Sequence, residues 1–404
     1  MKDEHHTRRH LGGAVSPPPV KRQRLDTPPS TPSQSAQPSP AAIEAGKEKI
    51  DDHLKYFLNY FELFRRENTL KAVPSLSLEE FAALYTRNAS KADGHNYVIH
   101  QHDHPRAGLH YDLRLQINPI SSCSWSIPYG IPGNPWERRQ GRRQAIETRI
   151  HCLWNHLVEA ASKITGSMLI WDIGEYEILP FEEEKEEKMT DDEASGVGSD
   201  SDDDEPVTRD ASELLPEPEK LERAFRSGKI RLRLHGTKVP VGYTITLRLS
   251  HDRGSAAKVT RKNTTLASSR RPSQMGAPVP GAGAHSEDAQ DFNDDDLNED
   301  PDSIDEIRRH NAYPGSVNTV DSEQQRWWFV SMDKLNCGFI KGKSADGKVT
   351  WTASNAKVKH DYPFFVKGRD EEFSVVTGRK AADVLQDEGV EGFVPRGHWK
   401  AALT

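Results

Sequence analysis

The chain has 404 residues, of which 34% are hydrophobic and 29% are charged. At about 100–200 residues per domain this length would form two or three domains, but the composition is too polar for all of it to pack into a core. No stretch approaches the ~18 apolar residues that cross a membrane, and residues 1–40 lack the apolar segment of a signal peptide. We therefore expect a soluble, intracellular protein with no membrane partner.

Charge divides the chain into a basic body and two acidic runs. Residues 182–205 hold 13 acidic residues against two lysines, and residues 287–306 hold 11 acidic residues and no base, so each run has a net charge of −11. Removing both from the total of −8 leaves +14 on the remainder of the chain. Solvation of surface loops is enough to explain the acidic runs. The basic body is suited to a phosphate backbone, which favours a nucleic-acid partner.

The three cysteines, Cys123, Cys152 and Cys337, are widely spaced and include no Cys-x-x-Cys pair. This spacing argues against a disulfide framework and against a zinc-finger site. Any metal bound by the chain is therefore expected to be held by histidines and carboxylates.

The N-terminal part of the chain divides into a polar tail and a helical segment. Residues 1–41 are rich in Pro, Ser and Gln, which predicts a disordered tail. Within it, Val20–Leu25 is typical of a short nuclear-import signal, so we expect a nuclear protein, with the cytoplasm as the alternative. In residues 42–90, apolar residues at helical spacing over Ile43–Arg66 and a capping box beginning at Ser77 predict two amphipathic helices.

Residues 91–336 show a pattern of short strands. Two low-complexity interruptions, at about 181–215 and 250–321, predict disordered acidic insertions in surface loops, which a folded core tolerates. Many short strands with little helix between them predict a mainly β domain, a small antiparallel barrel or sandwich. The predicted strands are Tyr97–Gln101, Tyr111–Ile117, Cys123–Ile127, Ser167–Trp171, Lys229–Leu234, Gly242–Leu249 and Trp327–Met332.

Residues 337–404 form a C-terminal extension in this interpretation. Their moderate hydrophobicity includes the pattern of a hairpin near Gly347 and of a helix over Lys380–Gln386. We expect the extension to pack on the barrel rather than to fold independently.

Polar residues that can carry chemistry are densest between Tyr97 and Gln116. Successive side chains of a strand point to opposite faces, so His110, Asp112 and Arg114 share one face while the residues between them share the other. The turn signals that precede them predict a hairpin. Such a hairpin would bring His102 beside His110 and Asp112.

Two imidazoles and one carboxylate around one point are typical of a catalytic divalent metal, and Mn²⁺, Zn²⁺ and Fe²⁺ are all compatible with these ligands. Arg114 adds a planar fork for a phosphate or carboxylate. Solvent exposure is the alternative for any single one of His100, His102 and His104. Burial of His110, Asp112 and Arg114 on one strand face without a ligand would be costly, so the set predicts a metal site for an anionic substrate.

A third element lies downstream, where His151 follows a group of arginines. These side chains would form a rim that binds phosphate, or a solvated loop if they stay apart from the site. The arginines are Arg138, Arg139, Arg142, Arg143 and Arg149.

These residues together resemble the 3′-phosphoesterase domain of bacterial DNA ligase D and its stand-alone relatives, including eukaryotic, mainly fungal, forms. Outside the two interruptions, the resemblance covers residues 97 to about 334. The matching pieces are Tyr97–Ile99 with His102, Leu109–Leu115, Ser124–Gly130, Arg138–His151, Leu169–Gly174, Gly228–Gly236 and Arg326–Asp333.

The resemblance implies a small β-barrel hydrolase that, with Mn²⁺, removes a terminal ribonucleoside and then a 3′-phosphate from DNA 3′ ends during repair; Zn²⁺ or another divalent transition metal is the alternative ion. It also implies a role for each matched residue. Carried over in this way, His102, His110 and Asp112 hold the metal, Arg114 and Arg143 grip the phosphate, and His151 contacts the transferring phosphoryl group or protonates a leaving oxygen. DNA 3′ ends would be the partner, with DNA-repair proteins acting in trans.

One spacing and three positions depart from the family pattern. The interval between the two ligand histidines is two residues longer, so His104 competes with His102 for the first ligand position, and we favour His102 because the strand before it aligns without a gap. Tyr129 stands where the family has Lys, Asn155 where it has Tyr, and His100 where it has Gln. Two alternative functions follow: a catalytically weak or inactive module that binds DNA ends or chromatin, and a phosphoesterase acting on RNA or another phosphate ester.

Overall fold

The structure of the protein is a computed structural model that describes residues 38–66, 74–137, 142–181, 214–250, 309–397 and 399–402. Every described helix and strand belongs to one compact unit, Ser39–Thr404. Residues 1–37 of the predicted tail, which include the import signal, lie outside the described residues, as do both acidic runs and most of the two predicted insertions. The predicted tail is a few residues too long, because a helix begins at Pro40. Within the described parts, no helix combines the length and the apolar character needed to cross a membrane.

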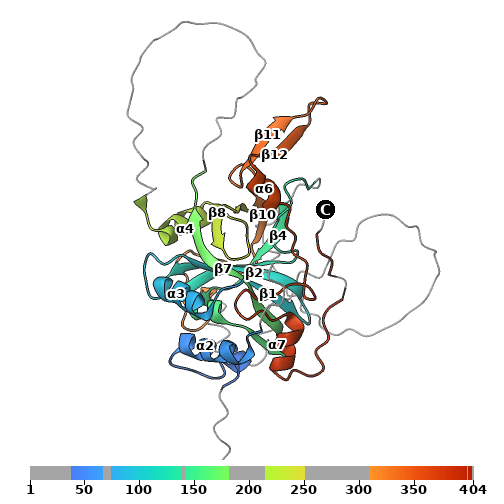
Figure 1. Ribbon diagram of the computed structural model, residues 1–404. Helices are drawn as coiled ribbons and strands as arrows, with labels where there is room; N and C mark the ends of the chain where they lie inside the picture. The colour runs from blue at the N-terminus through green and yellow to red at the C-terminus, as the bar shows by residue number, and fades with distance from the viewer. Residues whose placement is uncertain are drawn as a thin grey trace, which may run out of the picture. The chain divides into compact units, whose positions relative to one another are not determined.

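A closed antiparallel barrel of eight strands forms the centre of the fold (Figure 1). Each strand pairs with the next around the wall, and the last pairs with the first. The predicted fold class, a mainly β antiparallel barrel with few helices, is thereby confirmed. Around the barrel the strands are β1 (Asn96–His104), β2 (Gly108–Asn118), β3 (Ser121–Ile127), β4 (Arg142–Glu147), β10 (Trp327–Met332), β9 (Thr244–Leu249), β8 (Lys229–Gly236) and β7 (Gly166–Ile178).

Seven of these strands coincide with the predicted ones, and β4 was missed. Its sequence, Arg-Arg-Gln-Ala-Ile-Glu, is too polar to show strand alternation, and it is held in the wall by its pairing with β3 and β10. Two short strands lie beside the barrel wall: β5 (His151–Cys152) pairs with β3, and β6 (Ala160–Ser162) pairs with β7.

Alternation in the strands separates an apolar interior from an outer face. On β2, Leu113 and Leu115 point inward and are fully buried, opposite Trp125 and Cys123 of β3. Helix α4 (Glu217–Arg226), which the sequence did not predict, adds aromatic and aliphatic side chains to the same core. The residues between the inward ones on β1 and β2 therefore lie on the outer face.

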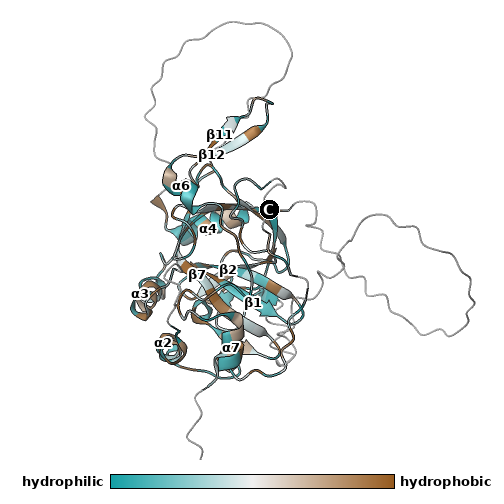
Figure 2. Ribbon diagram, turned by 45° about the vertical axis from the view of Figure 1, so that its right-hand side comes forward, coloured by the Kyte–Doolittle hydropathy of each residue, from teal (hydrophilic) through white to brown (hydrophobic). Residues whose placement is uncertain are grey.

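N-terminal helices cover part of this outer face. They are α1 (Pro40–Glu44), α2 (His53–Phe64) and α3 (Leu78–Asn88). The 3-10 helix η1 (Leu153–Leu157), from later in the chain, packs with them. Phe57, Phe61 and Phe81 are fully buried against outward residues of the barrel such as Val98 and Ile170. Figure 2 shows the apolar sides of α2 and α3 beside the strands. The capping box beginning at Ser77 is present and starts α3.

The C-terminal extension contains a hairpin and two short helices. The hairpin is β11 (Phe339–Lys343) with β12 (Val349–Ala353), and the helices are α6 (Ala356–Asp361) and α7 (Ala381–Asp387). The loop between α6 and α7 contacts the barrel directly: Trp171 Nε1 of β7 donates to Glu372 Oε2 at 2.7 Å. The hairpin forms a separate two-stranded sheet that stands off the barrel (Figure 1).

The second insertion is shorter than the predicted range of about 250–321. Residues 309–321 pack on the barrel instead: Ala312 forms a bridge with Ile150, and Val320 is 1% exposed. The Val317 amide donates to Ser121 Oγ at 2.8 Å. This segment has few apolar residues, and hydrogen bonds to its backbone hold it in place, so its composition resembled that of a loop.

Candidate metal centre

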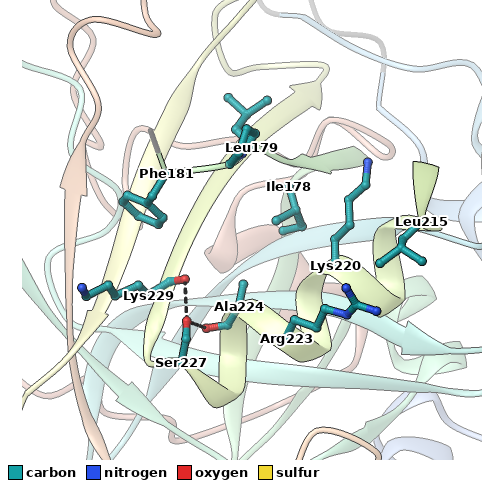
Figure 3. Close-up of a pocket in the computed structure, with 10 residues that line it drawn as sticks. Ile178, Leu179, Phe181, Leu215, Lys220, Arg223, Ala224, Ser227 and Lys229 are labelled. Atoms are coloured by element: carbon teal, nitrogen blue, oxygen red, sulfur yellow. Dashed lines mark hydrogen bonds between the residues drawn. The ribbon is translucent and has the colours of Figure 1, made fainter. Parts of the chain in front are cut away.

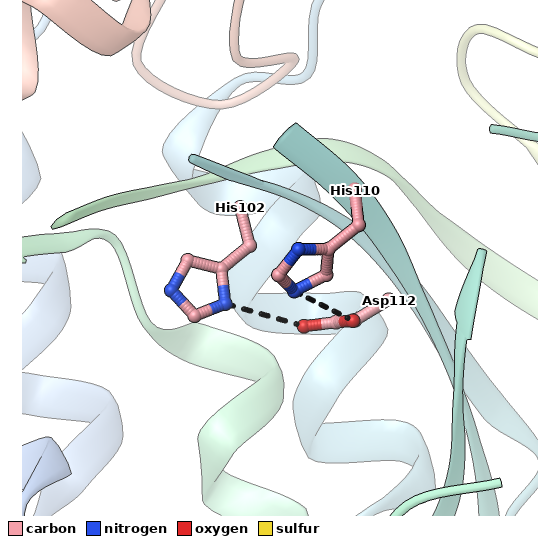
Figure 4. A group of neighbouring side chains, drawn as sticks. All are labelled: His102, His110 and Asp112. Carbon is pink, nitrogen blue, oxygen red and sulfur yellow. Dashed lines mark ion pairs between the residues drawn. The ribbon is translucent and has the colours of Figure 1, made fainter. Parts of the chain in front are cut away.

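His102, His110 and Asp112 meet on the outer face of β1 and β2. The strand register places His102 directly opposite His110, and Asp112 follows two residues later on the same face. One ligand atom from each residue lies within 4.8 Å of the other two. His102 Nδ1 is 3.6 Å from Asp112 Oδ2, and His110 Nε2 is 3.5 Å from Asp112 Oδ1 (Figure 4). Two ring nitrogens and one carboxylate thus converge on one point.

The second nitrogen of each imidazole is held by a backbone carbonyl. His102 Nε2 lies 2.8 Å from the Thr165 carbonyl oxygen, and His110 Nδ1 lies 2.9 Å from that of Gly108. In the neutral form of each ring, the nitrogen that donates its proton to a carbonyl fixes the tautomer and leaves the lone pair on the other nitrogen. His102 Nδ1 and His110 Nε2 are therefore the metal-facing atoms, and the donor set fits a divalent transition metal.

Mutual electrostatics keep the carboxylate ionised. Burial acts to raise the pKa of Asp112, but His110, His102 and Arg114 outweigh it and hold that pKa far below its usual range. Burial acts to lower the pKa of His102, but the Asp112 carboxylate outweighs it and raises that pKa to about 9. Burial lowers the pKa of His110. The cluster offers a negative, buried oxygen ligand to a cation.

His104, the alternative to His102 as first ligand, lies in the turn rather than at the cluster. Its Nδ1 accepts hydrogen bonds from the amides of Arg106 and Ala107, at 3.2 and 3.0 Å, so it closes the turn between β1 and β2. Burial is the main cause that lowers its pKa to about 3. The structure thus brings His102, rather than His104, to His110 and Asp112.

Arg114 extends the same face toward a second set of buried polar atoms. It is 3% exposed, and its Nη2 lies 3.9 Å from Asp112 Oδ2. Among the described residues, its Nε and Nη1 have no hydrogen-bond partner, and neither have the hydroxyls of Ser122 and Ser126 on β3. Ser126 lies directly opposite Asp112. Buried donors without partners are costly, and an anion bound beside the carboxylate would satisfy them.

Neutral histidines surround Arg114. Burial, followed by the charge of Arg114, holds the pKa of His151, His100 and His156 well below the usual value. His151 of β5 pairs with Ser122, and His100 pairs with Asp112, so both lie near the cluster. His156, whose Nδ1 lies 2.6 Å from Asn96 Oδ1, was missed by the sequence analysis because it follows no strand pattern.

Asn155 and Tyr129, two of the positions that depart from the family pattern, differ in burial. Asn155 is buried in η1, next to His156 in sequence. Tyr129 is 52% exposed, and its backbone carbonyl accepts a hydrogen bond from Arg143. The structure therefore does not bring the Tyr129 side chain to the metal cluster.

Arg143 requires a correction. It pairs with Val330 of the barrel core, so its side chain lies on the opposite face of the wall from the outward-facing Arg114. Its Nη1 donates to the carbonyls of Tyr129, Gly130 and Ile131 at 2.6, 3.1 and 2.9 Å. Arg143 thus supports the loop after β3, and the structure does not bring it beside Arg114, as the role implied by the resemblance would require. Arg138 and Arg139 lie outside the described residues.

A separate pocket of about 270 Å³ lies between the end of β7, helix α4 and the start of β8 (Figure 3). Its lining is apolar, from residues such as Ile178 and Phe181, with basic side chains such as Arg223. It shares no residue with the metal cluster, and the cluster remains the candidate for chemistry.

Comparison with known families gives one match. The family model of the DNA ligase D 3′-phosphoesterase domain matches residues 100–247. The matched span includes the metal cluster, Arg114 and His151, and the resemblance seen in the sequence is confirmed over these residues. A search of curated proteins gave no match. The match supports a hydrolase built on this barrel.

Proposed function

From the match of residues 100–247 to the DNA ligase D 3′-phosphoesterase domain, we propose that this protein is a metal-dependent phosphoesterase that removes phosphate or ribonucleoside from DNA 3′ ends in repair. One observation carries the proposal: the converging ligand atoms of His102, His110 and Asp112 share a face with Arg114, whose Nε and Nη1 are buried without partners. A cation site beside an anion site is the arrangement that phosphate hydrolysis needs.

The metal ligands in this proposal are His102 Nδ1, His110 Nε2 and an Asp112 oxygen. A bound divalent ion supplies Lewis acidity and lowers the pKa of a coordinated water. We propose Mn²⁺, with Zn²⁺ as the alternative, because two imidazoles and one carboxylate suit both ions. The carbonyls of Thr165 and Gly108 keep both imidazoles oriented toward the ion.

Arg114 and His151 act on the phosphate. The guanidinium of Arg114 is planar and always charged, so its two unpaired nitrogens can bind two phosphate oxygens at once. His151 is neutral beside it, because burial and the Arg114 charge lower its pKa. A bound phosphate anion offsets that charge, which raises the pKa of His151 and lets it donate a proton to the leaving oxygen.

DNA is the proposed partner because exposed basic residues extend beyond the site. Lys341, Lys343 and Lys348 of the β11–β12 hairpin are exposed and form no ion pair within the described residues. Together with the net charge of +14 outside the acidic runs, they favour a polyanionic partner. We also propose a nuclear location, from the import signal at Val20–Leu25, and repair proteins that act in trans on the same DNA ends.

The test is phosphate release from a DNA duplex that ends in a 3′-phosphate. The full-length protein is assayed with Mn²⁺ and with a chelator, next to the Asp112→Ala variant. We expect Mn²⁺-dependent release of phosphate by the wild-type protein. The rate should fall by more than roughly 100-fold in Asp112→Ala, because removal of an outer-shell partner alone costs up to that much. His235→Ala, an exposed histidine on β8, is the matched control and should keep the wild-type rate. Asp112→Asn, which keeps the side-chain shape, serves if the alanine variant does not fold.

Two outcomes would overturn the proposal. Absence of release, from a protein that binds both Mn²⁺ and duplex DNA, would favour the non-catalytic module that binds DNA ends or chromatin. Faster release from an RNA end, or from another phosphate ester, would keep the catalytic site and replace the substrate. A duplex with a single 3′-ribonucleotide tests the ribonucleoside step in the same assay.

A further inference from the structure

The two ligand histidines depend on two short turns of the backbone. Only two further residue pairs separate His102 and His110 from the β1–β2 turn at residues 105–107. The carbonyl that orients His110 belongs to Gly108, the first residue after that turn. The carbonyl that orients His102 belongs to Thr165, in the turn between β6 and β7. A shift of either turn would move a metal ligand.

Two arginines connect residues 369–397 of the C-terminal extension to the β1–β2 hairpin. Arg369 Nη1 forms an ion pair with Asp103 Oδ2 at 3.0 Å, and the side chain of Asp103 is 2% exposed. Arg396 Nη1 donates to the Arg106 carbonyl in the turn itself, at 2.8 Å. Arg369 Nη2 donates to the Arg396 carbonyl at 3.3 Å, so the two contacts are linked.

The same segment contacts a glycine at each of the two turns. Gly108 and Gly166 have φ of +80° and +77°, a conformation that favours glycine. A Cβ atom at Gly108 would lie 3.5 Å from Arg396 Cδ, which is an ordinary contact. One at Gly166 would lie 1.9 Å from the Asp103 carbonyl oxygen of β1 and 3.1 Å from Phe393 Cε2, so glycine at this position accommodates β1 first. Arg396 thus covers the residue whose carbonyl orients one ligand histidine. Phe393 packs beside Gly166, the residue after Thr165, whose carbonyl orients His102.

We propose that residues 369–397 position the metal centre, with Arg369 and Arg396 as positioning residues that fix the β1–β2 turn. Both arginines lie outside the matched span of residues 100–247, so the chain uses an element beyond that span to complete its site. The inference rests on the proposed metal-binding function. It adds a role for the C-terminal extension, which the match leaves unassigned.

The physical argument is preorganisation. An ion pair to a largely buried carboxylate and a charged donor on a turn carbonyl both restrict the end of the hairpin. Without them, the turn samples more conformations, and metal binding must then restore the order that the extension provides. Outer-shell contacts of this kind contribute about 10–100-fold to metal affinity.

The experiment measures Mn²⁺ affinity by isothermal titration calorimetry on the full-length protein and on Arg369→Ala and Arg396→Ala. We expect each variant to bind Mn²⁺ about 10–100-fold more weakly. The control is Arg231→Ala on β8: the Arg231–Asp333 pair is 2.9 Å long with exposures of 19% and 9%, against 18% and 2% for Arg369–Asp103. It should lower thermal stability comparably and leave the Mn²⁺ affinity unchanged.

Two readouts separate positioning from general support. The electron paramagnetic resonance spectrum of bound Mn²⁺ should broaden in Arg369→Ala, because the ligands are less uniformly held. Arg369→Lys, which keeps the charge next to Asp103, should recover most of the affinity. A purely structural role predicts an unchanged spectrum.

The outcomes distinguish the inference from the function on which it rests. Wild-type affinity and spectrum in both alanine variants would overturn the positioning role and leave the proposed function intact. Absence of Mn²⁺ binding by the wild-type protein would overturn both. Arg396 is exposed, so its variant carries the test if Arg369→Ala does not fold.

Discussion

Two buried arginines on this protein have opposite surroundings. Arg379, at 0% exposure, is paired throughout: its Nη2 lies 2.8 Å from Glu159 Oε2, its Nε donates to Thr377 Oγ1, and its Nη1 donates to the Tyr60 hydroxyl. Arg114, at 3% exposure, leaves Nε and Nη1 without a partner among the described residues. Burial alone therefore does not distinguish a structural arginine from one that binds a ligand.

The carboxylates beside the two arginines differ in the same way. Glu159 accepts from Arg379, Ser374, Thr377 and the Ile170 amide, so its lone pairs are used within the protein. Asp112 faces two imidazoles at 3.6 and 3.5 Å, which is too long for hydrogen bonds and leaves room for an ion between them. The first cluster joins the C-terminal extension to the barrel. The second has donors and acceptors that remain available to a ligand.

The largest effect should come from breaking the structural cluster. Glu159→Gln removes the carboxylate 2.8 Å from Arg379 Nη2 and leaves the buried charge with the Asp387 carboxylate, 3.4 Å from Nη1. Loss of one member of a buried pair costs about 3–5 kcal/mol. We expect the free energy of unfolding in urea to fall by that amount, while Mn²⁺ affinity of the folded protein stays within about twofold. A stability close to that of the wild type would show that solvent reaches Arg379 and would remove the contrast.

A smaller effect in free energy, but a larger one on activity, is expected at the other arginine. Arg114→Lys keeps the charge and loses the planar fork that binds two oxygens. Phosphate release should fall about 100–1,000-fold, the usual loss when one charge-stabilising donor is removed. The free energy of unfolding should change by less than about 1 kcal/mol, because two of the donors it removes have no partner to lose. Equal stability losses at Arg114 and at Glu159 would contradict the distinction.

The last effect is a dependence of stability on pH, which leaves activity at neutral pH unchanged. Burial holds the pKa of His156 well below its usual value, so the folded protein does not take up the proton that the unfolded chain binds as the pH falls through about 6.5. Stability is therefore present above that pH and lost below it, by up to about 1.4 kcal/mol per pH unit for this residue. His156→Gln should reduce the slope of unfolding free energy between pH 6 and 5 by about that amount. Urea titrations at fixed pH measure it, with His235→Gln at the surface as the control; an unchanged slope in His156→Gln would refute it.

Local patterns in the sequence were enough to predict most of the barrel and the metal cluster. Alternation in Leu109–Leu115 identified β2 and placed His110, Asp112 and Arg114 on one face, because a strand has a strict period of two. The turn signals at Pro105 and Gly108 then located the hairpin that brings His102 across. The register of a tight hairpin is a short-range property, so one sequence sufficed.

Elements held by long-range pairing could not be predicted in this way. Strand β4 takes its place from β3 and β10, the second of which lies about 180 residues away in sequence. Residues 309–321 are fixed by hydrogen bonds to their backbone, which leave no apolar pattern. The resemblance implied a phosphate-binding role for Arg143, but only the pairing of β4 with β10 shows that its side chain lies on the opposite face of the wall from Arg114.

The sequence by itself determined which residues could form the hydrolytic site, since ligand type and strand periodicity are written in consecutive residues. Only the tertiary structure decided which of them meet: His102 instead of His104, Arg114 without Arg143, and a hairpin backed by Arg369 and Arg396 from more than 250 residues away. The physical reason is that a polar atom can bind a ligand only if no other group of the protein already pairs with it. That depends on the packing of segments that are distant in the chain.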